Sequence, residues 1–149
     1  MSELPAGHRR ALLEVAAALG GHDIPFGVGG SALLALLGMP VTVGDLDVLV
    51  PVGIDPPSLP WRAVDPGLPP GPIASDWIRR GPVLGIPVDL ISGLRVDTGS
   101  GVVEIPIDGG GVVDVGGVEV TLSSPRAWRE LYRRHRTRRA ELLEEWLDL

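Results

Sequence analysis

Asp45 and Asp47 are the residues whose spacing first suggests chemistry, because they stand two positions apart at the start of an apolar segment that ends at Pro51. The pattern of residues 45–50 predicts a β-strand. Alternate side chains of a strand point to the same face, so the two carboxylates are expected side by side. Adjacent carboxylates repel each other unless a cation lies between them or one of them holds a proton. Oxygen ligands at this spacing suit Mg²⁺ or Mn²⁺.

A third aspartate, Asp89, lies in another apolar segment, residues 83–91, which is also expected to form a strand. A carboxylate flanked by Val88 and Leu90 needs a partner. If the two strands are neighbours, three carboxylates converge. Such a trio can hold two divalent ions, which clamp the attacking and leaving oxygens in phosphoryl transfer.

Gly29-Gly30-Ser31 lies between residues 24–28, predicted as a strand, and residues 32–37, predicted as a helix. Glycines at such a turn let a phosphate approach the backbone, and the N–H groups at a helix start favour anions. The Ser31 hydroxyl adds another donor. We therefore interpret this turn as a phosphate cradle facing the metal site.

Other elements must position these residues. Apolar residues recur at helical spacing over 12–19, and eight prolines between residues 51 and 72 predict a long irregular loop. Ser124-Pro125 is typical of a helix start, so one C-terminal helix is expected over 124–149. The remaining expectations are a short helix over 73–80 and strands over 102–107, 112–115 and 118–122, the last two joined as a hairpin at Gly116-Gly117. This order predicts an α/β (α+β) single domain over residues 1–149, with a mixed β-sheet flanked by helices.

Composition excludes several chemistries. The chain has no cysteine, and all 13 basic residues are arginine, so thiol catalysis, thiolate zinc sites, lysine Schiff bases and the P-loop lysine are excluded. The net charge of −6 argues against a general nucleic-acid coat. Residues 126–139 nevertheless carry seven arginines, either as a solvated helix face or as a strip that binds a polyanion.

No apolar run resembles a signal peptide or a membrane span, so a cytoplasmic location is expected.

Gly29-Gly30-Ser31, a helix, Asp45-Leu46-Asp47 and the later Asp89 together resemble the nucleotidyltransferase superfamily typified by DNA polymerase β. More narrowly, they resemble the small bacterial members of the minimal and abortive-infection toxin types. The resemblance implies the nucleotidyltransferase fold and transfer of a nucleoside monophosphate from an NTP such as ATP to an acceptor hydroxyl, with release of pyrophosphate.

On this resemblance, Asp45, Asp47 and Asp89 would be the catalytic residues and would bind two Mg²⁺ or Mn²⁺ ions, with Asp89 on the acceptor side. Gly29, Gly30 and Ser31 would hold the nucleotide. The acceptor stays open among an RNA, a protein and a small molecule. A homo-oligomer and a toxin–antitoxin partner are further candidates.

Two alternatives remain open. Residues 27–32 also fit the dinucleotide-binding pattern G-x-G-x-x-A. The other alternative is a catalytically inactive nucleotidyltransferase fold that binds a nucleic acid or a protein. Related proteins often carry Arg and Thr before the first aspartate, where this chain has Val41 and Val43, and a lysine in the final helix, near which Tyr132 stands.

Overall fold

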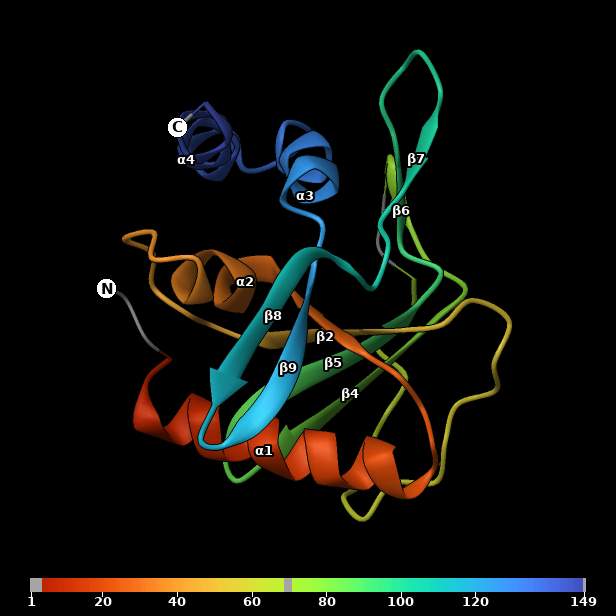
Figure 1. The fold of residues 1–149 in the computed structure, drawn as a ribbon. Coiled ribbons are helices and arrows are strands. Elements are labelled where there is room, and N and C mark those ends of the chain that lie inside the picture. The colour runs from red at the N-terminus through yellow and green to blue at the C-terminus, as the bar shows by residue number, and fades with distance from the viewer. Residues whose placement is uncertain (1–3, 69–70, 149) are drawn as a thin grey trace.

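The computed structural model describes residues 4–68 and 71–148, and their strands form two sheets (Figure 1). The helices are α1 (Ala6–Gly21), α2 (Gly30–Leu36), α3 (Pro125–Tyr132) and α4 (Thr137–Leu147). The strands are β1 (Gly27–Gly29), β2 (Leu46–Val50), β3 (Ile73–Ala74), β4 (Trp77–Val83), β5 (Ile86–Ser92), β6 (Arg95–Asp97), β7 (Val102–Glu104), β8 (Gly109–Val115) and β9 (Val118–Ser123).

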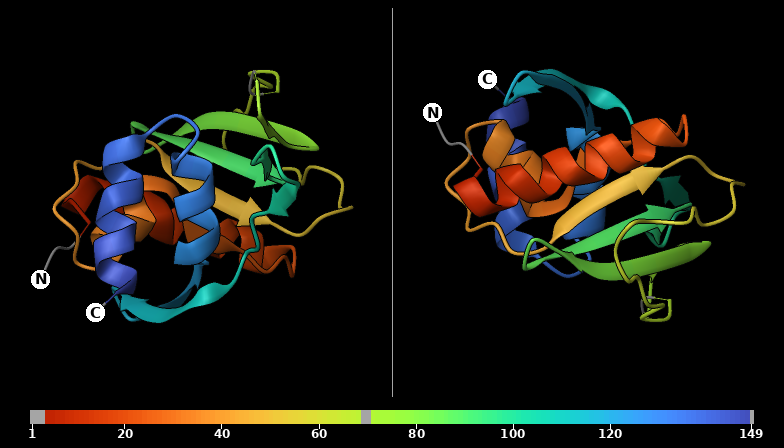
Figure 2. Two further views of the ribbon diagram at one scale, coloured as in Figure 1. Left: turned by 90° about the horizontal axis from the view of Figure 1, so that it is seen from above. Right: turned by 90° about the horizontal axis from the view of Figure 1, so that it is seen from below.

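The larger sheet is mixed, as the sequence predicts. Its strand order is β4-β5-β2-β1-β9-β8, with β2 and β5 parallel, β1 and β9 parallel, and the other neighbours antiparallel. The smaller sheet has the order β3-β6-β7 and projects beside α3 (Figure 1). Seen from below, α1 crosses in front of the strands, whereas α3 and α4 lie in front when the molecule is seen from above (Figure 2). The sheet is therefore covered by helices on both sides.

One part of the core lies between α1 and the large sheet, and the core also includes buried residues of α2, α3 and α4. Leu12, Val15 and Leu19 recur along one side of α1 and are fully buried, as their helical spacing predicts. In β2, Leu46 and Val48 are also fully buried, two residues apart. Because alternate strand residues face opposite sides, Asp47 is turned away from the face that Leu46 and Val48 share.

The predicted helix over residues 73–80 is wrong. This segment forms β3 and the first half of β4, and β4 forms a hairpin with β5 through the turn at Leu84-Gly85. Both turn residues have positive φ, 51° and 81°, which matches the backbone of a tight two-residue hairpin turn. The expected strand over 83–91 therefore divides at this turn. The local sequence favours neither a helix nor a strand here. Pairing with the buried strand β5 determines that the segment forms a strand.

The C-terminal segment differs from the single helix expected over 124–149. Ser124 caps α3 as predicted, its hydroxyl accepting a hydrogen bond from the Ala127 N–H at 3.2 Å. The helical path then stops, and Arg136 adopts φ −139° and ψ 67° before α4 begins. Folding α4 back against α3 brings Arg133 within 2.7 Å of Glu144. The apolar stripe fits one straight helix as well as two packed helices, so only the tertiary contacts distinguish them.

The proline-rich loop is held against β4 by several contacts, among them a backbone bridge between Val64 and Arg80. The Trp77 indole N–H donates to the Ile54 carbonyl at 2.9 Å, and Trp61 packs so closely on β4 that a Cβ at Gly81 would lie 2.7 Å from its ring. Beyond β7, which ends at Glu104 rather than at the expected residue 107, the chain turns into β8. Among the described residues, no helix combines the length and the apolar character needed to cross a membrane.

Candidate active site

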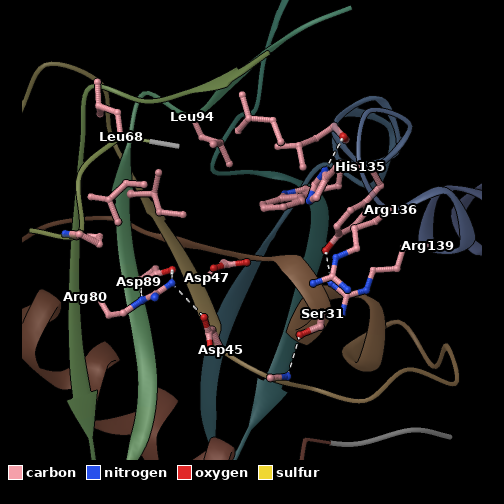
Figure 3. Close-up of a pocket in the computed structure, with 18 of the residues that line it drawn as sticks. Ser31, Asp45, Asp47, Leu68, Arg80, Asp89, Leu94, His135, Arg136 and Arg139 are labelled. Atoms are coloured by element: carbon pink, nitrogen blue, oxygen red, sulfur yellow. Dashed lines mark hydrogen bonds and ion pairs between the residues drawn. The ribbon is translucent and has the colours of Figure 1, made fainter. Parts of the chain in front are cut away.

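The three predicted aspartates come together where β2 and β5 run side by side. Asp47 and Asp89 are direct partners in this parallel pair, and Asp45 stands immediately before β2. Their side chains all line one cavity of about 520 Å³ (Figure 3). The prediction that Asp89 lies beside the Asp45–Asp47 pair therefore agrees with the geometry.

Arg80, which the sequence did not single out, lies among these carboxylates. It is the cross-strand partner of Asp89 in the β4–β5 hairpin. Its guanidinium donates to both oxygens of Asp89, at 2.7 and 2.9 Å, and to Asp45 at 3.2 Å. The two-pronged contact with Asp89 is the strong geometry for an arginine–carboxylate pair. Arg80 thus occupies the space between the first and third acids (Figure 3).

Asp47 is the member of the trio that forms no ion pair with the described residues. Burial, together with the nearby charges of Asp89 and Asp45, raises its pKa from 3.8 to about 7. Arg80 and Arg139 act in the opposite direction. Within the described part of the chain, no donor forms a hydrogen bond with the Asp47 carboxylate. A partly buried carboxylate with no donor is a group in need of a cation or a proton.

The glycine turn differs from the simple cradle that the sequence suggests. A Cβ at Gly29 would lie 2.2 Å from the Trp128 ring, and one at Gly30 would lie 2.1 Å from the Asp47 carboxylate. Gly30 also has φ +62°, which favours glycine. These glycines are thus required by close packing of Trp128 and Asp47. Of the predicted nucleotide-binding residues, Ser31 alone lines the cavity.

Ser31 keeps a free donor despite its burial. Its Oγ accepts a hydrogen bond from the Gly44 N–H at 3.3 Å, which leaves the hydroxyl proton available. Ser31 lines the same cavity as the three aspartates. Ser31 can therefore donate to an oxyanion placed beside Asp47.

A basic wall faces the carboxylates across the cavity. His135, Arg136 and Arg139 line this wall, above Ser31 in the close-up view (Figure 3). Arg139 reaches back over Tyr132, with its guanidinium carbon 5.4 Å from the ring centre and Nη1 3.4 Å from the phenol oxygen. Its charge lowers the pKa of Asp47, so Arg139 acts electrostatically within the site.

Tyr132 contacts Arg139 and fixes its position. Comparing residue 132 with the lysine of related proteins does not reveal this contact. Burial raises its pKa to about 12, so the phenol stays protonated at neutral pH. The side chain is buried beside Trp128, whose ring centre lies 5.6 Å away. The fixed ring holds the Arg139 guanidinium at the cavity. Arg139 of α4 thus places a positive charge next to residue 132.

The remaining wall is apolar. It carries side chains from the small sheet, from β4 and β5, and from the proline-rich loop, namely Leu68, Ile73, Ile78, Ile91 and Leu94. Leu68 and Leu94 lie on the side away from Ser31 in the close-up (Figure 3). The cavity is thus divided into an acidic floor, a basic wall and an apolar wall.

The donor set suits a divalent cation at Asp45 and Asp47, since both supply carboxylate oxygens and Asp47 has no hydrogen-bond donor. Asp89 is less available, because Arg80 contacts both of its oxygens. Across residues 4–68 and 71–148, no three His, Asp or Glu side chains are arranged as ready metal ligands. The residues that fit a metal as they stand are therefore Asp45 and Asp47.

The topology excludes the dinucleotide-binding alternative. That motif requires its first strand to pair in parallel with the next strand of a βαβ unit. Here β1 and β2 are antiparallel, with Gly29 opposite Asp47. The G-x-G-x-x-A match in residues 27–32 is therefore a coincidence of packing glycines.

Comparison with solved structures supports the fold. The chain resembles the crystal structure of a "putative nucleotidyltransferase" from Thermotoga maritima, with a TM-score of 0.61 and 19% identity, over 99% of this chain and 96% of the other. Comparison with protein-family models gives no match, and comparison with curated protein sequences gives none either. The chain therefore has the nucleotidyltransferase fold, in agreement with the fold predicted from the sequence.

Proposed function

We propose that the protein is a metal-dependent nucleotidyltransferase that moves a nucleoside monophosphate from an NTP to an acceptor hydroxyl. The observation that carries this proposal is the register of β2 and β5. It sets Asp47 directly beside Asp89, across a cavity from Arg136 and Arg139. Carboxylates for a cation and guanidinium groups for phosphates face each other there, which is the arrangement that phosphoryl transfer needs.

The residues divide by charge. Asp45 and Asp47 would hold the divalent cation, which when bound neutralises phosphate charge and favours ionisation of the acceptor hydroxyl. Ser31, Arg136 and Arg139 would contact the triphosphate, because they provide donors on the wall opposite the acids. The anionic tail is thereby directed away from Asp89.

The acceptor would then lie on the Asp89 side. Its oxygen forms a bond to the α-phosphorus as the bond between that phosphorus and the bridging oxygen breaks. Pyrophosphate leaves with the electron pair of the broken bond, and the acceptor proton passes to Asp89 or to water. Arg80 fixes the Asp89 carboxylate through two hydrogen bonds, so it is a positioning residue in this step.

Transfer of label from α-³²P-NTPs, together with pyrophosphate release, tests the proposal. Asp47→Asn should abolish NTP–Mn²⁺ binding and turnover, whereas Asp55→Asn, at an exposed loop position, should leave both unchanged. Asp89→Asn should keep NTP binding and lose turnover. Equal NTP–Mn²⁺ binding by the wild type and Asp47→Asn would show that the site is wrongly assigned.

The second candidate, an inactive binding module, is favoured by one observation. Arg80 already contacts both Asp89 and Asp45, where a cation shared by these acids would lie. Salt-dependent binding of a tRNA or a DNA without turnover of any NTP would support this candidate. Turnover that disappears in Asp89→Asn would exclude it.

A further inference from the structure

A second cavity adjoins the basic wall, and none of the three aspartates lines it. Its volume is about 450 Å³, and Arg136 and Arg139 line both this cavity and the candidate active site. We call it the arginine groove. Its lining consists of Pro40, Val41, Thr42, His135, Arg136, Thr137, Arg138, Arg139 and Leu142.

We propose that the arginine groove binds inorganic pyrophosphate and is the path by which it leaves the active site. This inference rests on the proposed function for the origin of the pyrophosphate, but the binding itself can be measured without turnover. The ligand class is a condensed phosphate with no base attached.

The direction of the reaction supports this assignment. In an in-line displacement the leaving group departs on the side opposite the attacking oxygen. The acids and Arg80 occupy one side of the cavity, and the donors suited to phosphate occupy the other (Figure 3). The leaving pyrophosphate would therefore be directed toward Arg136 and Arg139, and the groove begins at these side chains.

The chemistry of the lining supports a phosphate ligand. Three arginines line the groove together with Thr42 and Thr137, and its lining includes no acidic residue. The only acid that contacts one of these arginines in the described chain is Glu141, which lies 3.4 Å from Arg138. Both side chains of that pair are exposed, so the pair is weak and leaves Arg138 available. The protein has a net charge of −6, so the positive charge of the arginine groove contrasts with that of the whole chain.

The size of the groove is also compatible. A cavity of about 450 Å³ has room for several water molecules, which phosphate oxygens can replace. A separate compartment would let pyrophosphate move away while the modified acceptor still covers the mouth of the active site. Arg136 and Arg139 would contact the phosphates first, and Arg138 would contact them after cleavage.

Arg138 provides the decisive variant because it lines the groove and not the active site. Arg134 is the matched control, being an exposed arginine of the same segment that lines neither cavity. Isothermal titration of the full chain with inorganic pyrophosphate should show binding that Arg138→Gln weakens about tenfold, as expected for loss of one charge-assisted contact. Arg134→Gln should bind like the wild type, and Arg138→Gln should change NTP affinity less than twofold.

Three outcomes decide the inference. Equal pyrophosphate affinity in Arg138→Gln and the wild type would overturn it, even if the protein turns over NTPs. Loss of single-stranded oligonucleotide binding without loss of pyrophosphate binding in Arg138→Gln would also overturn it, in favour of a nucleic-acid groove. A selective loss of pyrophosphate binding supports it. The proposed function fails separately, through the labelled-NTP assay and Asp47→Asn.

Discussion

Replacing Asp47 with asparagine should stabilise the protein at neutral and alkaline pH. In the folded state, burial and the charges of Asp89 and Asp45 raise the pKa of this carboxyl from 3.8 to about 7. Between these two values the folded chain holds a proton that the unfolded chain releases. Raising the pH therefore favours unfolding, and the wild type loses stability as the pH approaches 7. Asparagine does not titrate, so the variant lacks this loss.

The magnitude follows from the same values. At about 1.4 kcal/mol for each pH unit, the difference between 3.8 and about 7 corresponds to about 4 kcal/mol. Because the carboxylate lines an open cavity, water screens part of this energy. We expect the free energy of unfolding of Asp47→Asn to exceed that of the wild type by about 2 kcal/mol above pH 7, and to match it near pH 4.

Urea denaturation between pH 4 and 8 measures this difference. Asp55→Asn serves as the control, because it removes an exposed carboxylate and should follow the wild type at every pH. At pH 8, Mg²⁺ at 100 times its dissociation constant should stabilise the wild type by about 3 kcal/mol and the Asp47→Asn variant much less. Parallel pH profiles for the wild type and Asp47→Asn would refute the reasoning.

Three further variants, with Gly38→Ala as a control for one of them, test glycine packing, helix capping and charge. Gly30→Ala should lower the free energy of unfolding by about 3 kcal/mol, because it combines φ +62° with a clash against Asp47, whereas Gly38→Ala, with φ +93° and open space, should lower it by about 1 kcal/mol. Ser124→Ala should remove the cap of α3 and lower the same quantity by about 1 kcal/mol in urea denaturation. Arg80→Gln should raise the pKa of Asp47 above about 7, as followed by carboxyl ¹³C NMR, and an unchanged titration would show that the Arg80 charge does not reach Asp47.

The acidic part of the site was predictable because its signals are local. Asp45 and Asp47 share a strand face through the two-residue period, and Asp89 is conspicuous between Val88 and Leu90. The sequence could not supply the pairing that brings them together. That pairing depends on the contact of β2 with β5, which are separated in the sequence by the proline-rich loop, β3 and β4.

Arg80 was missed for a related reason. The segment before Pro82 was predicted as a helix, in which residue 80 has no defined relation to Asp89. In the hairpin the two residues are cross-strand partners, and their ion pair follows directly from the register. The signal that could have found it is Leu84-Gly85, two residues between apolar runs, which are compatible with a tight turn once positive φ is allowed at leucine.

The arginine strip shows how one compositional signal separates into two roles. Arg133 contacts Glu130 and Glu144 and so links α3 to α4. Arg136 and Arg139, a few positions further along, line the cavities instead. The start of α4 lies at the cavity that Asp45 and Asp47 also line, and neither role is visible while the strip is taken as one helix face. Packing of α4 against α3, with Ala140 and Leu143 buried, brings Arg136 and Arg139 to the cavities, and the exposed Arg133–Glu144 ion pair adds little to that packing.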